Sequence, residues 1–397
     1  MTSRIIVSIV LFIFLGVIGT SIVSAEEETL PLSEEELMEK QLDQLNMDEI
    51  GEFWNSIRNE YGGFLPELQR DSFMDLLSNK NDDSFSVKAW GLAFLKFFFH
   101  EIVAQGQLLG TLILLTVFSM LLVHLQQAFE KFQISKVAYA VTYMVLIIIA
   151  LNSFHIAMQL ADSTLQVMNS FMVALVPMLL VLMATVGSVT SVALFHPMVM
   201  FIVHSSGLFV QYFILPLLLL STILSIVSTM TDHYKVSKLA LFLRNIAVGS
   251  LGIFLTVFLG VLSVQGATAA VADGIAIRTA KFVTGNFIPV VGRMFTDAAD
   301  TVMGASLLLK NTIGVLGLFV LLLICTFPAL KVLAISIIYS FTAAVLQPLG
   351  GGPIIECLSI VGKNILFVFA ALAAVSLMFF LSITIIIISG NLSIMLR

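Results

Sequence analysis

The sequence predicts an all-α polytopic membrane protein with about nine transmembrane helices, which follow a signal peptide and a small helical extracytoplasmic region. The chain of 397 residues is 59% hydrophobic and only 11% charged, with a mean hydropathy of +1.05. Ordinary soluble proteins carry about 25% charged residues. Residues 26–100 hold 17 of the 25 acidic and six of the 19 basic residues, a net charge of −11, whereas residues 101–397 carry +4. This composition argues against a soluble enzyme or a nucleic-acid-binding protein.

Residues 1–25 have the composition of a secretory signal peptide. Arg4 precedes an apolar run over residues 5–18, and the small residues of Val23-Ser24-Ala25 provide a cleavage site before Glu26. An uncleaved first transmembrane helix is the alternative. In both cases the chain from Glu26 onward is expected to lie outside the cytoplasm.

Residues 26–100 form an acidic region that is predicted to be helical. Ser33 and Glu36 have the spacing of a capping box, in which each side chain bonds the backbone amide of the other residue. An apolar stripe at helical spacing follows, made of Ile50, Phe53, Trp54, Ile57 and Tyr61. Gly62-Gly63 is expected to end this helix through a left-handed conformation, and a further helix is expected over residues 66–78. We expect a small domain packed on itself; docking of the stripe onto a partner is the alternative.

Residues 101–397 form the predicted membrane domain. Seven intervals in it lack Asp, Glu, Lys and Arg: 102–129, 137–161, 163–231, 245–272, 311–330, 332–355 and 364–396. Each is long enough for a helix of about 20 residues, the length that crosses a hydrocarbon core of about 30 Å. The interval 163–231 has room for three helices, with turns near Gly187-Ser188 and around residues 211–216. Nine spans result, centred near residues 114, 147, 180, 202, 222, 255, 320, 340 and 377.

An odd number of spans places the C-terminus in the cytoplasm when residues 26–100 lie outside. The cytoplasmic segments then follow the positive-inside rule, because they carry Lys131, Lys136, Lys235, Lys238, Arg244, Lys331 and Arg397. Residues 266–311 weaken the pattern, because four basic residues in this segment would lie outside the cytoplasm: Arg278, Lys281, Arg293 and Lys310. Alkaline phosphatase is therefore expected to be active when fused near Lys80 and inactive when fused at Arg397.

The sequence contains no pattern typical of a catalytic, metal or cofactor site. His100-Glu101 lacks the second histidine of a zinc protease motif, and Gly350-Gly351-Gly352-Pro353 lacks the Lys-Ser/Thr that follows a phosphate-binding loop. Cys325 and Cys357 are too few for a disulfide framework or a structural zinc site. We therefore expect no catalytic residue and no cofactor.

Two histidines within the spans are weaker candidates for a cavity. His196 and His204 are eight residues apart, so on a continuous helix they would lie about 80° apart and face one space. Pro197 would break such a helix, and an ordinary interior histidine is the alternative for each.

Residues 266–311 differ from the spans, because charged residues alternate there with large apolar ones. We expect an amphipathic segment that lies in the membrane interface, re-enters the membrane or lines a water-filled cavity. An ordinary pair of interfacial helices is the alternative. Pro289 would interrupt a helix, and the Asn286 side chain would satisfy the freed backbone groups. The candidate interface or cavity residues are Arg278, Lys281, Asn286, Pro289, Arg293, Asp297 and Asp300.

Several stretches occur together and in the same order in one known family. They are Ile50-Gly51-Glu52-Phe53-Trp54, Glu60-Tyr61-Gly62-Gly63, residues 137–155, residues 225–231, Arg278-Thr279-Ala280-Lys281-Phe282, Asn286-Phe287-Ile288-Pro289 and Gln347-Pro348-Leu349-Gly350-Gly351-Gly352-Pro353. On these stretches, which cover most of residues 50–397, the chain resembles the stage III sporulation protein AE family of endospore-forming bacteria. Residues 1–48 resemble the family only in having a signal peptide followed by an acidic polar stretch.

The resemblance implies a role that composition does not. Members of this family look like multi-pass components of a channel or secretion-like complex that joins mother cell and forespore, in the mother-cell membrane around the forespore. The implied partners are other proteins of the same operon, including an ATPase and ring-forming subunits, together with stage II sporulation protein Q and the lipid bilayer. Late forespore gene expression is expected to depend on the complex.

A stand-alone permease for a small solute is the alternative function. Helices broken at Pro177, Pro216, Pro289 and Pro328 would favour it. An intramembrane enzyme ranks last, because no nucleophile, metal set or acid–base pair can be assembled from the sequence.

Overall fold

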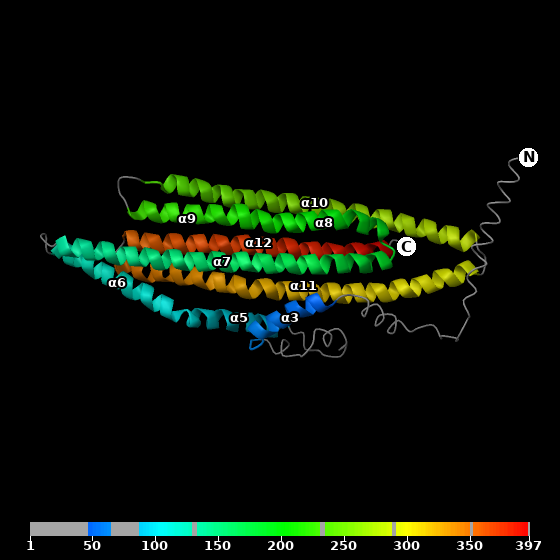
Figure 1. The fold of residues 1–397 in the computed structure, drawn as a ribbon, viewed down its shortest axis with the longest axis horizontal. Coiled ribbons are helices and arrows are strands. Elements are labelled where there is room, and N and C mark those ends of the chain that lie inside the picture. The colour runs from blue at the N-terminus through cyan, green and yellow to red at the C-terminus, as the bar shows by residue number, and fades with distance from the viewer. Residues whose placement is uncertain are drawn as a thin grey trace, which may run out of the picture.

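The computed structural model describes residues 47–64, 87–128, 133–230, 235–287, 291–349 and 352–395, and these are almost entirely helical. The expected signal peptide, the Ser33–Glu36 capping box and the helix expected over residues 66–78 lie outside these ranges. Figure 1 shows long helices that run alternately in opposite directions along one bundle. The elements are α3 (Asp48–Tyr61), α5 (Val87–Ala104), α6 (Gly106–Ala128), α7 (Gln133–Thr185), α8 (Val189–Phe209), the π-helix η2 (Val210–Ile214), α9 (Leu215–Met230), α10 (Ser237–Phe287), α11 (Val291–Leu346), the 3-10 helix η3 (Gln347–Leu349) and α12 (Pro353–Met395).

Six helices in the described part of the chain are long and apolar enough to cross a membrane. They cover Gly106–Leu125, Val137–Thr185, Phe195–Met230, Ser237–Val264, Thr301–Leu346 and Pro353–Asn391. The helical, multi-pass architecture is confirmed, but the count of nine spans is not. The predicted spans near 147 and 180 both lie in α7, those near 202 and 222 lie in the continuous run from α8 to α9, and those near 320 and 340 lie in α11.

The structure joins three pairs of predicted spans into continuous helical runs, and in two of these pairs a single charged residue was read as the end of a span. Asp162 lies inside α7, where its Oδ2 accepts a hydrogen bond of 3.0 Å from Gln166 Nε2. Lys331 lies inside α11, where its Nζ is 3.7 Å from Glu60 Oε1. Because each charge finds a partner within the protein, the helix continues through it.

Prolines do not interrupt the helices where the sequence suggested breaks. Pro177, Pro197 and Pro328 lie inside α7, α8 and α11. Pro216 follows η2, and its ring would clash with the carbonyl of Tyr212 in a regular α-helix. The π turn that contains Tyr212 is wider and relieves this clash, so a turn expected at residues 211–216 is a local bulge. Broken helices at Pro177 and Pro328 therefore give no support to a permease.

The turn predicted near Gly187 is confirmed and has a clear cause. Gly187 has a φ of 90°, a left-handed conformation that glycine adopts without a Cβ penalty. The Gly187 amide bonds the Ala184 carbonyl at 2.9 Å and the Ser188 amide bonds the Met183 carbonyl at 3.1 Å, which is the Schellman pattern at a helix end. The end of α3 at Tyr61 is also where we predicted it, but the stated reason is wrong, because Gly62 has the right-handed φ of −58°.

The core is the contact of α7 with the antiparallel pair α11 and α12. A Cβ at Gly317 of α11 would lie 2.5 Å from Leu175 Cδ2 of α7, and one at Gly314 would lie 2.7 Å from Ile387 Cδ1 of α12. These glycines therefore leave room on α11 for the side chains of Leu175 and Ile387. Buried hydroxyls add cross-links, since Tyr339 of α11 donates to Ser153 Oγ of α7 at 2.9 Å.

The apolar stripe of α3 faces this core. Ile50, Trp54, Ile57 and Tyr61 are buried, and the Phe53 ring meets the Phe171 ring of α7 edge-on at 5.3 Å. The helix predicted from the stripe is thus confirmed. In the described residues its stripe packs on α7 and α11, not in a separate core of the acidic region.

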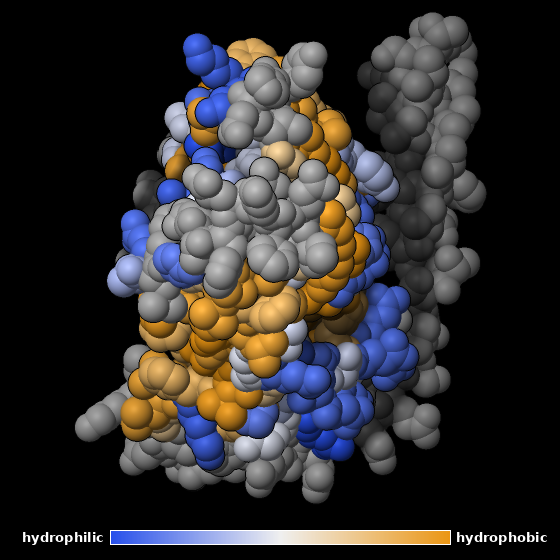
Figure 2. Space-filling model, turned by 90° about the vertical axis from the view of Figure 1, so that its left-hand side faces the viewer, coloured by the Kyte–Doolittle hydropathy of each residue, from blue (hydrophilic) through white to orange (hydrophobic). Residues whose placement is uncertain are grey.

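The long helices exceed the thickness of one bilayer. The candidate span in α7 has 49 residues, and at 1.5 Å per residue it is about 74 Å long, compared with a hydrocarbon core of about 30 Å. Only a part of α7 can lie in that core at the usual tilts. Figure 2, a view along the bundle from the end that carries the α9–α10 and α11–α12 turns, shows hydrophobic residues over much of the surface, with hydrophilic ones along the upper left edge and at the lower right.

The number of spans is testable by its parity. Six spans follow α5, so residues before Gly106 and the C-terminus are expected on the same side of the membrane, whereas nine spans put them on opposite sides. We therefore expect alkaline phosphatase fused at Arg397 to be as active as the enzyme fused near Lys80. A fusion in the α9–α10 turn after Met230 is the matched cytoplasmic control. An inactive fusion at Arg397 beside an active one at Lys80 would contradict the six-span fold.

Candidate functional site

A polar cavity of about 700 Å³ lies where α11 ends and α12 begins. Its charged lining residues are Glu356 and Lys363, both exposed and two turns apart on α12. Ser340 and Gln347 of α11 and Ser359 of α12 complete its polar wall. The boundary between the spans predicted near residues 340 and 377 falls here, and η3 and the start of α12 at Pro353 agree with it. These groups suit binding of a polar partner; they include no thiol and no histidine.

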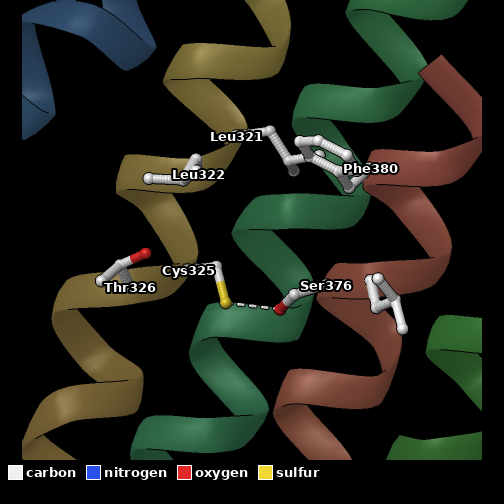
Figure 3. A pocket seen from close by; sticks show the side chains of 7 residues that line it. Leu321, Leu322, Cys325, Thr326, Ser376 and Phe380 are labelled. Atoms are coloured by element: carbon white, nitrogen blue, oxygen red, sulfur yellow. Dashed lines mark hydrogen bonds between the residues drawn. The ribbon is translucent and has the colours of Figure 1, made fainter. Parts of the chain in front are cut away.

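A second, apolar pocket of about 310 Å³ lies between the same two helices, farther from their turn. Leu321, Leu322, Leu377 and Phe380 supply most of its wall, and Cys325 and Ser376 meet in it through a hydrogen bond. Figure 3 shows these side chains converging from α11 and α12. Gly362 of α12 allows α11 and α12 to approach closely, because a Cβ at this position would lie 2.5 Å from Ser340 Oγ of α11.

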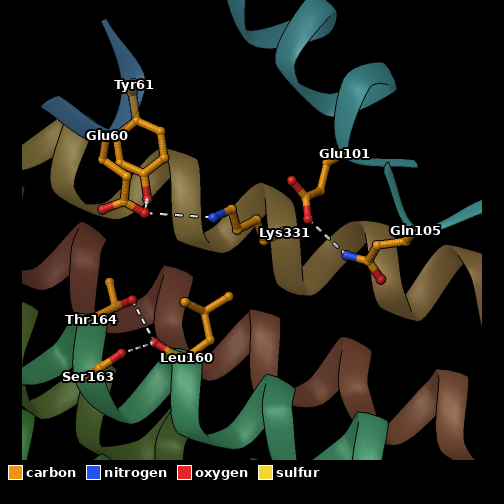
Figure 4. A network of polar contacts seen from close by, with 8 residues as sticks. All are labelled: Glu60, Tyr61, Glu101, Gln105, Leu160, Ser163, Thr164 and Lys331. Atoms are coloured by element: carbon orange, nitrogen blue, oxygen red, sulfur yellow. Dashed lines mark hydrogen bonds and ion pairs between the residues drawn. The ribbon is translucent and has the colours of Figure 1, made fainter. Parts of the chain in front are cut away.

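The docking site of α3 on α11 carries a small polar network (Figure 4). The Tyr61 hydroxyl donates to Glu60 Oε1 at 2.7 Å, and Lys331 Nζ lies 3.7 Å from the same oxygen. The Tyr61 ring stacks on Phe327 of α11 at 4.1 Å. Burial raises the pKa of the Tyr61 phenol, and the hydrogen bond to Glu60 raises it further, so the hydroxyl stays protonated and remains a donor. The ion pair is partly exposed and contributes at most about 1 kcal/mol, so the aromatic stack is the stronger attachment.

This contact contradicts the predicted location of Lys331. Lys331 was expected in a cytoplasmic loop and Glu60 outside the cytoplasm, but the two side chains form an ion pair. Both therefore lie at one level of the bundle. The prediction failed because it assigned Lys331 to a loop, whereas the residue lies in the interior of α11.

Lys310 is a polar feature that the sequence reasoning misplaced. It was expected outside the membrane at the end of the segment 266–311, but its side chain is fully buried between α11 and α12. Its Nζ donates to the Ile387 carbonyl and to Asn391 Oδ1, both at 3.0 Å. Gly390 leaves room for the ammonium group, because a Cβ there would overlap with Lys310 Nζ. In the described ranges no carboxylate pairs with this ammonium group, and ionisable residues inside membrane bundles commonly have a functional role.

The residues proposed from the sequence within 266–311 are distributed over two helices. Arg278, Lys281 and Asn286 lie in α10, and the other described ones, Arg293, Asp297 and Asp300, lie in α11. Pro289 lies outside the described residues. Figure 1 shows the last part of α10 and the first part of α11 extending beyond the ends of α7, α8 and α12. The six described candidates thus lie on the last part of α10 and the first part of α11, which project from the bundle.

The two candidate histidines both lie on α8, which is continuous through Pro197. His196 and His204 are exposed, and neither lines the two cavities described above. His204 Nδ1 lies 3.3 Å from Asn169 Nδ2 of α7. Over the ranges that the structure describes, no three His, Cys, Asp or Glu residues are arranged to hold a metal ion.

Comparison with known proteins gives one consistent result. The family model for stage III sporulation protein AE matches residues 68–390. Stage III sporulation protein AE of Bacillus subtilis (strain 168) is 58% identical over 363 residues, which cover 91% of this chain and 90% of the relative. No solved structure matches.

The environment of Lys310 generates a prediction about stability. Asn391→Leu removes one of the two acceptors of a buried ammonium group and is expected to reduce the free energy of unfolding by about 1.5–3 kcal/mol. Adding Lys310→Met should restore most of this loss, because both polar groups are then replaced by apolar ones. Thermal unfolding of the purified protein in detergent measures both effects. Lys363→Met, at an exposed site, is the control, and a double variant no more stable than Asn391→Leu alone would contradict the assignment.

Proposed function

The chain belongs to the stage III sporulation protein AE family, and on that basis we propose that it is a membrane subunit of the channel or secretion-like complex that links mother cell and forespore. The observation that carries the proposal is the identity of 58% over 91% of the chain with a sporulation protein. The six candidate spans support a multi-pass subunit. We propose the mother-cell membrane around the forespore as its location.

The proposed partners are the other proteins of the same operon, including an ATPase and ring-forming subunits, and stage II sporulation protein Q. The hairpin of α10 and α11 is our proposed contact region. It extends beyond the neighbouring helices in Figure 1 and its sequence alternates charges with large apolar residues. A projecting hairpin of this kind is accessible to other subunits and to lipid head groups.

A deletion strain tests the proposed function. We expect loss of the gene to leave engulfment of the forespore intact and to abolish late forespore gene expression, because the complex would lack a membrane subunit. A reporter driven by a late forespore promoter measures this, and re-expression of the intact chain is the control. Normal reporter activity and normal spore yield in the deletion strain would refute the proposal.

Charge reversal tests the contact region. Arg278→Glu, Lys281→Glu and Arg293→Glu should each reduce spore yield while the protein remains inserted, because reversed charges repel an acidic partner or anionic lipid. Arg278→Lys, Lys281→Arg and Arg293→Lys keep the charge at the same positions and are the matched controls. Spore yield and the amount of protein in the membrane are measured together. Normal yield from all three reversals at unchanged protein levels would leave α10 and α11 as a connector.

A further inference from the structure

The outward face of α7 changes its chemistry along the helix. Near the start of α7 the exposed residues are apolar: Val137, Val141, Met144, Val145 and Ile148. From residue 152 to residue 170 six of the eight exposed residues are polar, and the other two are Ile156 and Val167. The polar ones lie at helical spacing: Asn152, His155, Gln159, Ser163, Gln166 and Ser170. Beyond them Val173 and Val181 are exposed again. We name the six polar residues the α7 polar stripe; it lies in the middle of a candidate membrane span.

The exposed surfaces of α11 and α12 are apolar at the same level. Ser376 of α12 donates to Met168 Sδ of α7 at 3.7 Å and also bonds Cys325 of α11, so these three helices share this cross-section. There α11 and α12 expose Leu322 and Leu377 beside the apolar pocket of Figure 3.

A third helix repeats this apolar surface. His204 of α8 meets Asn169 of α7, and Phe209 at the end of α8 stacks on Phe254 of α10 at 4.7 Å. Val257, within one turn of Phe254, is 59% exposed. One cross-section of the bundle therefore has a polar side on α7 and apolar sides on α10, α11 and α12.

The helix next to the stripe is hydrophilic on its outer face. α3 contacts α7 through Phe53 and Phe171, and its outward residues Asp48, Glu49, Glu52 and Asn59 are exposed. Exposed carboxylates are stable in water and costly in hydrocarbon. The α7 polar stripe and the outer face of α3 thus form adjoining surfaces that both favour water.

We infer that the α7 polar stripe faces a water-filled space inside the assembled membrane complex, while the flank formed by α10, α11 and α12 faces lipid. This inference rests on the proposed function, because the rest of the complex must enclose the space. It identifies α7, and not the α11–α12 pair, as the wall of a hydrated path. Amides, hydroxyls and an imidazole suit such a wall, because they form hydrogen bonds with water.

Cysteine accessibility tests the inference at single residues. Native Cys325 and Cys357 are buried and are first changed to Ala. Ser163→Cys and Ser170→Cys then place one thiol on the stripe with the replacement of one atom. Val257→Cys and Leu377→Cys place one thiol on the apolar flank at the same level and are the matched controls. Each variant is expressed in sporulating cells and first checked for normal spore yield.

Two measurements are made on membranes from these cells. The first is the rate of reaction with a charged, membrane-impermeant methanethiosulfonate, which requires the thiolate and therefore water. We expect the stripe thiols to react at least about tenfold faster than the flank thiols. The second is quenching of a bimane attached to each thiol by lipids brominated on their acyl chains, which should occur only at the flank.

Three results would overturn the inference. Slow reaction and bromine quenching at the stripe would mean that it faces lipid. Slow reaction without quenching would mean that a protein helix covers it. Equally fast reaction at stripe and flank, with quenching at neither, would mean that this level of the bundle lies outside the bilayer. None of these results changes the reporter assay of the deletion strain, so failure of the inference is distinguishable from failure of the proposed function.

Discussion

Close packing of α7 against the α11–α12 pair is the interaction on which the other helices depend. Gly314 and Gly317 of α11 leave room for side chains of α12 and α7, and α3, α5, α9 and α10 each pack against a member of this trio. Lipid chains are as apolar as leucine, so burial of apolar area gives little gain inside a bilayer, and dispersion contacts at short distance become more important. A buried hydrogen bond also crosses this contact, from the Tyr339 hydroxyl of α11 to Ser153 Oγ of α7.

Features that depend on local spacing were predictable from the sequence. The stripe from Ile50 to Tyr61 is one face of α3, and the turn at Gly187 lies where glycine and serine interrupt an apolar run. The ends of the spans were not predictable, because Asp162 and Lys331 were read as boundaries although each has a partner that comes from the folded chain. A partner such as Glu60, far away in sequence, leaves no local pattern.

The candidate functional residues were likewise predictable only in part. The charges of residues 266–311 were conspicuous in the sequence, and the structure assigns those in the described ranges to α10 and α11. The α7 polar stripe was not predicted, because the spans were delimited by Asp, Glu, Lys and Arg, whereas the stripe consists of Asn, Gln and Ser residues and a single His. Lys310 was found and misplaced, since a single lysine at the edge of an apolar run looks the same whether it ends a helix or is buried inside one. A periodicity search for amides and hydroxyls would have detected the stripe.

The length of the helices gives the molecule a mechanical property. Helices packed along their full length bend little, so a movement at one end is carried to the other as a rotation of the whole rod. For a helix of 49 residues such as the span in α7, a rotation of about 5° displaces the far end by about 6 Å. This is more than the width of a water molecule. A tilt of about 5° imposed where α10 and α11 project would therefore move the opposite end of such a rod by more than the diameter of a water molecule.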